Sequence, residues 1–297
     1  MSDRASFTDM ITFGFRTMAW RPVHSAVLIG AASLLNIAYY MWAQSESGQG
    51  WASWNAQSVV AMQSGSFGAY LPVFAVSMVI GLLISAVFYA GIYRVMLRED
   101  ARAVMPFGLG RDEVNLILVF LALAGIFLLF MIALMVVMFI VIFVLGLVLA
   151  PIGGGATTDR LAASIGFIVV GLMALPIGYF FGRVAVSVPL TIRMRAFSLG
   201  GWKASKGMGW SLLGAHVVVY ILLVVLMLVF MQGGMSGGYQ FSDPSYDQLV
   251  ASIANPYGDW LFLAVPVQMA ATFVFMGPTA AVAAKHMSAE SVAKTFE

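Results

Sequence analysis

The sequence predicts an all-α, polytopic membrane protein with six transmembrane helices in three hairpins and with interfacial amphipathic helices on the cytoplasmic side. The first observation is composition, since hydrophobic residues fill 61% of the 297 positions, charged residues fill 9%, and the mean hydropathy is +0.95. Soluble domains carry about 25% charged residues, so lipid is the expected solvent. The other two observations are a set of long apolar stretches and a strong imbalance of basic residues between alternate connections.

Six stretches reach the length of roughly 20 apolar residues that a helical span requires. We place these spans, within a single membrane domain over 1–297, at residues 24–44, 70–95, 115–150, 162–190, 209–231 and 260–284. The first span is too long for a signal peptide and is expected to stay uncleaved. Ahead of it, residues 5–20 predict a helix in the headgroup layer, because apolar side chains recur there at helical spacing. Those side chains are Phe7, Met10, Ile11, Phe15 and Met18.

Basic residues predict the orientation of the spans. They concentrate in the N-terminus, 94–113, 193–208 and the tail. The other connections, 45–69, 151–161 and 232–259, contain Arg160 as their only basic residue. The positive-inside rule assigns the basic set to the cytoplasm. We therefore expect both termini in the cytoplasm and three hairpins that point outward.

The third span is longer than one crossing requires, because residues 114–150 carry no charged side chain. Two crossings would need a polar turn near residue 132, where the chain is uniformly apolar. One continuous helix would be about 55 Å long at 1.5 Å per residue. Its outer end, with Val144 and Leu147, would then pack against the N-terminal part of the fourth span, a second subunit or another membrane protein. The alternative is a break near Gly146, followed by an interfacial segment.

Residues 195–210, RAFSLGGWKASKGMGW, are unusually polar and lie between two apolar spans. One interpretation is an interfacial anchor, since Trp prefers the membrane boundary and Lys extends its charge toward water. The other is a lipid-headgroup or partner contact. Its candidate residues are Arg183, Trp202, Lys203, Ser205 and Lys206. Arg183 is expected to extend toward the cytoplasmic surface.

Polar side chains inside the spans need a partner or a wet cavity. The candidates are Asn36, His216 and Gln268, for which a structural hydrogen bond is the first expectation. The three histidines show no metal-binding spacing, cysteine is absent, and no phosphate-binding loop motif occurs. We therefore predict no catalytic residue, metal or cofactor. Ser242-Asp243-Pro244 is typical of a helix N-cap rather than of a metal site.

Two segments carry a family resemblance: FGFRTMAWRPVHSAVLIG near the N-terminus and RVAVSVPLTIRMRAFSLGGWKASKGMGWSLLG around the fourth and fifth spans. Together they resemble a group of bacterial six-span inner-membrane proteins related to the membrane domain of glycerophosphodiester phosphodiesterases. The matching residues are Gly14, Arg16, Pro22, Arg183, Pro189, Trp202, Lys203, Ser205 and Gly207. The resemblance implies a bacterial inner membrane and a six-span fold. The group carries no agreed activity, so the resemblance implies none, and we expect no counterpart here of the catalytic module of the fused relatives.

These observations favour a non-enzymatic protein that acts as an accessory, scaffold or membrane-homeostasis component through contacts with membrane lipids or proteins. A net charge of +2 gives no reason to expect nucleic acid as a partner. The alternative is a transporter or channel for a small or lipid-like solute. Ion-coupled transport is disfavoured because no predicted span interior contains Asp or Glu.

Overall fold

The computed structural model describes residues 4–64, 67–99, 110–149, 174–234 and 246–295, and they contain helices and no strand. The helix at 174–185 continues after a turn at Val186 into α7. The labelled helices are α1 (Phe7–Trp20), α2 (Pro22–Gln44), α3 (Glu46–Gln63), α4 (Phe67–Leu97), α5 (Arg111–Leu149), α7 (Ser187–Met194), α8 (Gly201–Ala204), α9 (Gly209–Gly234), α10 (Tyr246–Ala254), η2 (Gly258–Trp260), α11 (Leu261–Phe275) and α12 (Gly277–Thr295).

The described helices confirm an all-α, multi-pass membrane protein. Within the described residues, five helical segments are long and apolar enough to cross a membrane, and α9 adds a shorter apolar helix at Gly209–Val225. The five segments are Pro22–Gln44, Tyr70–Leu97, Arg111–Val141, Ala174–Met194 and Tyr246–His286. Much of their surface is apolar and faces outward, as expected where lipid rather than water surrounds a helix.

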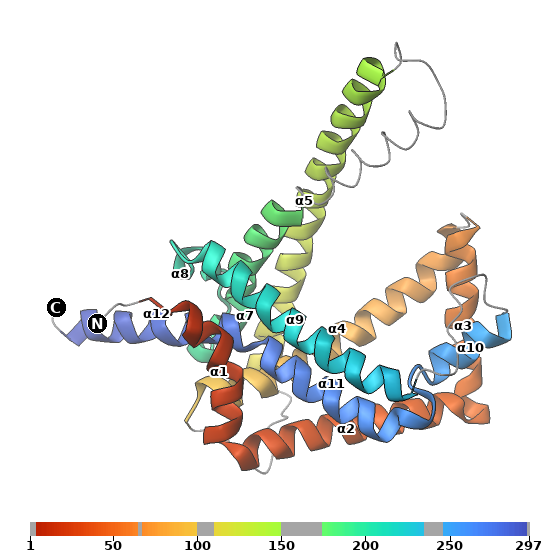
Figure 1. Cartoon of the computed structure of the whole chain (residues 1–297), viewed down its shortest axis with the longest axis horizontal. Coiled ribbons are helices and arrows are strands. Elements are labelled where there is room, and N and C mark those ends of the chain that lie inside the picture. Colours follow the sequence, from red (N-terminus) through yellow and green to blue (C-terminus); the bar gives the residue numbers. More distant parts are fainter. Residues whose placement is uncertain (1–3, 65–66, 100–109, 150–173, 235–245, 296–297) are drawn as a thin grey trace.

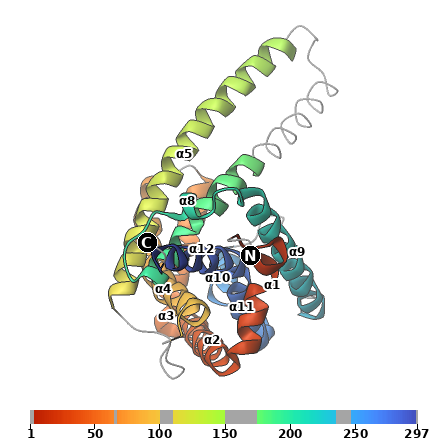
Figure 2. The ribbon, with the colours of Figure 1, turned by 90° about the vertical axis from the view of Figure 1, so that its left-hand side faces the viewer.

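One end of the molecule, which we call the basic end, holds most of the packed core. The helices α1, α7, α8 and α12 meet there with the last turns of α4 and the first turns of α5. Large buried side chains pack there, among them Met10, Ile92, Leu116 and Ile192 of these elements and Phe273 of α11. From this end, α5 rises away from the other long helices, while α2, α4, α9 and α11 run toward the opposite, far end (Figures 1 and 2).

Helix α1 covers the segment predicted as an amphipathic helix and lies at the basic end, while its place in the headgroup layer stays a prediction. At its start, the Asp9 amide donates to Ser6 Oγ at 3.0 Å, and the Ser6 amide donates to the Asp9 carboxylate at 3.3 Å. Its buried face includes Gly14, which lies on the bend between α11 and α12. A Cβ at Gly14 would be 2.8 Å from the Cα of Val274, and one at Gly277 would be 2.7 Å from the Gly14 nitrogen. The two glycines therefore permit backbone-to-backbone packing of α1 on this bend.

The far end is closed by α3 and α10, which pack against each other (Figure 1). Ala43, Ala52 and Ala254 form a small core there, and the Tyr246 hydroxyl donates to the Ser53 carbonyl at 3.1 Å. Residues 45–69 were expected to connect two spans, and in the structure most of this connection is the helix α3. The segment is too polar to register as a span, and its contacts with α4 and α10 stabilise it as a helix.

Tryptophan side chains lie at both ends of the helical body. Trp20, Trp202 and Trp210 are at the basic end, and Trp42, Trp51, Trp54 and Trp260 are at the far end. Indole rings favour the boundary between hydrocarbon and water. The two sets are therefore where the surfaces of a bilayer would be expected to meet the protein.

Three predicted spans can be compared in detail with the helices that the structure describes. The third is one continuous helix from Arg111 to Leu149, as expected, without a break at Gly146. The fourth span is interrupted by a turn at Val186, after which α7 begins. Pro189 lies in the first turn of α7, where a backbone amide would have no partner within the helix, so the missing N–H of proline costs little. The predicted sixth span is divided, because α11 ends at Phe275 and α12 begins at Gly277. Pro278, in the first turn of α12, favours that new start.

Candidate functional site

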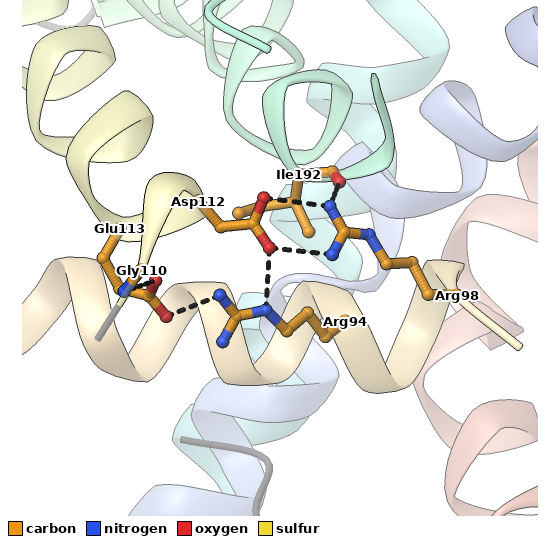
Figure 3. Close-up of polar contacts among 6 residues, drawn as sticks. All are labelled: Arg94, Arg98, Gly110, Asp112, Glu113 and Ile192. Carbon is orange, nitrogen blue, oxygen red and sulfur yellow. Dashed lines mark hydrogen bonds and ion pairs between the residues drawn. The ribbon is translucent and has the colours of Figure 1, made fainter. Parts of the chain in front are cut away.

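Two polar groups at the basic end combine charge with burial. The first is the ion-pair cluster, formed by Arg94 and Arg98 of α4 with Asp112 and Glu113 of α5 (Figure 3). The arginines are four residues apart on one helical face, so both reach the first turn of α5. The Asp112 carboxylate accepts from Arg94 Nε at 3.0 Å and from Arg98 Nη1 and Nη2 at 2.7 and 3.0 Å. Arg94 Nη2 also approaches Glu113 Oε1 at 2.6 Å, as an ion pair rather than a directed hydrogen bond.

Backbone groups at helix ends complete the cluster. Arg98 donates to the Ile192 carbonyl in the last turn of α7 (Figure 3), and Arg21 donates to the carbonyls of Val95, at 3.0 Å, and of Arg98. Glu113 accepts the Gly110 amide at 2.9 Å ahead of α5. Cations thus meet carbonyls at helix C-termini and carboxylates lie at a helix N-terminus, which is the favourable arrangement for the helix dipoles.

The ion-pair cluster joins four elements that are distant in sequence: the start of α2, the end of α4, the start of α5 and the end of α7. Its carboxylates are engaged by arginines, so the arrangement suits a structural junction better than an acid–base site. The cluster was not predicted from the sequence, in which residues 94–113 were interpreted only as a basic connection. The available signal was the spacing of Arg94 and Arg98, followed by adjacent acids at the start of an apolar run.

The second group is Arg183 beneath residues 195–210, which we call the connector. Arg183 is 7% exposed. Its Nε donates to Ser205 Oγ at 3.1 Å, its Nη2 to the Trp202 carbonyl at 2.6 Å and its Nη1 to the Tyr179 hydroxyl at 3.3 Å. The guanidinium carbon lies 3.6 Å from the centroid of the Trp202 ring, a close cation–π contact. The expected extension of Arg183 toward water is therefore wrong, because the connector folds over it and supplies its acceptors.

A close backbone approach holds the connector on α7. The Gly201 amide donates to Ser187 Oγ at 3.0 Å, and Ser205, which is fully buried, donates to the Gly201 carbonyl at 2.7 Å. A Cβ at Gly201 would stand only 2.6 Å from Ser187 Oγ, so glycine is required by packing. Nearby, Gly207 adopts a φ of 76°, in the left-handed region, and turns the chain toward α9.

The predicted connector residues consequently have two different roles. Arg183 and Ser205 point inward and fix the fold of the connector. Lys203 and Lys206 are exposed, and Trp202 and Trp210 remain 44% and 64% exposed. The chain contains no Asp or Glu between residues 161 and 242. The connector therefore presents positive charge and indole rings that no nearby carboxylate in this stretch neutralises.

The polar residues predicted inside the spans form structural hydrogen bonds and do not meet at one point. His216 Nδ1 lies 2.8 Å from the Leu212 carbonyl, and its ring packs edge-on against Phe275. Asn36 donates to the Ala32 carbonyl at 2.9 Å. Gln268 accepts the Tyr257 hydroxyl.

At the outer part of α5, Val144 is 50% exposed, whereas the side chain of Leu147 lies outside the described residues. The predicted N-cap at Ser242-Asp243-Pro244 also lies outside them, and α10 begins at Tyr246. Among the described side chains, no group of three or more His, Cys, Asp or Glu could hold a metal ion. The chain matches no protein-family model, no curated protein and no solved structure in the comparisons made.

Proposed function

We propose that the chain is a six-span protein of a bacterial inner membrane that acts without catalysis, as an accessory, scaffold or membrane-homeostasis component, through contacts with lipids and neighbouring membrane proteins. In this proposal the basic end and both termini face the cytoplasm. The tryptophans at the two ends, and the basic residues around α1, α8 and α12, support this placement.

The observation that carries the proposal is the shape of α5. This helix contacts α4 and α7 near its start and the helix at 174–185 through Phe127 and Phe130, and it diverges from α2, α4, α9 and α11 (Figures 1 and 2). Beyond its first turns, large apolar side chains are exposed on several faces, including Leu129, Met135, Phe139 and Phe143. Such a surface is stable only against acyl chains or an apolar partner. A helix that projects from a rigid, charged base into lipid is suited to contact rather than to chemistry.

Orientation can be tested directly because the chain has no cysteine. Single cysteines at Gly50 in α3 and at Lys203 in α8 are treated, in intact cells, with a membrane-impermeant maleimide. We expect labelling at position 50 alone, and labelling at 203 after the membrane is permeabilised. Labelling of position 203 in intact cells would overturn the proposed orientation.

The contact function is tested by purification in mild detergent, with the co-isolated lipids and proteins identified. We expect anionic phospholipid to be enriched over its share in the bulk membrane, since the basic end attracts an anionic surface. An unenriched lipid profile, without any recovered membrane protein, would argue against a contact function. Detergent-matched preparations of an unrelated multi-pass protein provide the background.

A further inference from the structure

The exposed lysines of the connector lie beside an apolar surface that continues into the expected membrane region. Lys203 and Lys206 are one turn apart, and the Lys206 amide donates to the Lys203 carbonyl at 3.1 Å. Neither lysine forms an ion pair with a residue that the structure describes. Behind them, the Arg183 guanidinium is bonded to neutral acceptors only and adds to the positive potential.

The adjacent apolar surface is a ladder of aromatic rings. The Trp202 ring packs on Phe180 with centroids 5.6 Å apart, and Phe180 stacks on Phe130 of α5 at 5.1 Å. Beside it, Tyr179 contacts Trp210 at 4.9 Å. The ladder therefore leads from the connector onto the helix at 174–185 and the middle of α5. Its rings are half-buried or exposed, which leaves surface for a further apolar chain.

This pairing of positive charge with an aromatic surface matches an amphipathic anion. We propose that the connector and the aromatic ladder bind one anionic phospholipid, with its phosphate at Lys203 and Lys206 and its acyl chains along Trp202, Phe180 and Phe130. The inference rests on the proposed lipid-contact function and names the headgroup class and the site. Free phosphate would use the lysines alone and leave the ladder without a role. A zwitterionic headgroup would bring an ammonium group to a stretch that has no carboxylate.

Arg183 is a positioning residue for this site. Its cation–π contact and its bond to the Trp202 carbonyl fix the indole between the lysines and the ladder. The bond from Nε to Ser205 holds the turn that carries Lys206. Because Arg183 is buried, its substitution would disturb the fold as well as the site. The exposed lysines are therefore the better probes.

The experiment titrates the purified full chain, in mild detergent, with dioleoylphosphatidylglycerol and separately with dioleoylphosphatidylcholine, and counts bound lipids by native mass spectrometry. The variants are Lys203→Gln and Lys206→Gln. The matched control is Lys285→Gln, which removes an exposed lysine of α12 outside the connector. We expect tighter binding of phosphatidylglycerol than of phosphatidylcholine to the unaltered chain. Each connector variant should weaken phosphatidylglycerol binding about fivefold, as one cation near an anionic surface contributes, and the control should not.

The outcomes separate the site from the general function. If Lys285→Gln weakened phosphatidylglycerol binding as much as the connector variants do, the proposed site would be overturned. Only a diffuse attraction of lipid to the basic end would then remain. No preference for phosphatidylglycerol in the unaltered chain would overturn both proposals. Displacement of the lipid by inorganic phosphate at equal concentration would show that the ladder does not contribute, and would also overturn the site. Unchanged thermal unfolding of both connector variants establishes that any loss of binding is local.

Discussion

Replacing Asp112 with Asn tests whether the ion-pair cluster stabilises the basic end. The Asp112 carboxylate accepts three hydrogen bonds from two arginines, and its side chain is 12% exposed. Asn keeps the shape but removes the charge, and its amide group presents donors to guanidinium donors. Arg94 and Arg98 would then share Glu113 as their remaining carboxylate in the cluster. Removing one partner of a buried ion pair lowers the stability of a protein by about 3–5 kcal/mol. We expect the loss from Asp112→Asn to fall in this range.

The assay is reversible unfolding of the purified chain in mixed micelles with increasing dodecyl sulfate, followed by circular dichroism. Asp9→Asn is the matched control, since the ion pair of Asp9 with Arg16 is 3.4 Å long and largely exposed. A pair of that kind contributes below about 1 kcal/mol. Removing both charges with Arg98→Met and Asp112→Leu should cost less than Asp112→Asn alone, because Arg94 keeps Glu113 and no second arginine competes for that carboxylate. A loss from Asp112→Asn no greater than that from Asp9→Asn would refute the reasoning.

Three further predictions concern other parts of the chain. Gly201→Ala should lower the stability of the protein by about 1–3 kcal/mol through overpacking, since the added Cβ would meet Ser187. Gly50→Ala, whose Cβ would lie in open space, should not destabilise the protein. Thermal unfolding of the two variants tests this difference. Hydrogen bonding with the N-cap side chain chiefly lowers the pKa of Asp9. The contribution of the Asp9 carboxylate to stability is therefore full above about pH 4, and it is lost as the pH falls through the lowered pKa. An unfolding series should show the difference from Asp9→Asn shrinking in acid, and a constant difference would contradict it. Val144→Glu should lower thermal stability in bilayers or change native size, because its exposed site on α5 faces lipid or a partner. Unchanged stability and size would exclude that contact.

The fold could be predicted from the sequence where the signal is local. Long apolar runs predict helices in lipid regardless of their neighbours, which is why α2, α4 and α5 begin and end close to their expected bounds. That residues 7–20 form a helix was also predictable, from the spacing of their apolar side chains and from the proline after them. Helix α3 was not, because it is polar on most of its surface and depends on α4 and α10 for its stability.

The candidate site was only partly predictable, for a related reason. The connector has an unusual composition, so Trp202 and Lys203 could be singled out. The inward position of Arg183 depends on acceptors about 20 residues later in the chain, and sequence alone does not show that the connector folds back over it. The division between α11 and α12 likewise reflects the close approach of Gly14 and Gly277, which are far apart in sequence.

The ion-pair cluster also has a consequence for the order of biogenesis. Arg94 and Arg98 precede Asp112 by 18 and 14 residues, so both arginines leave the ribosome before their partner does. During that interval the two arginines are already present as cations at the end of α4, and cations beside a span set the direction in which it inserts. In the finished fold the same two charges are neutralised inside the protein. Arg94→Gln should therefore alter insertion as well as stability.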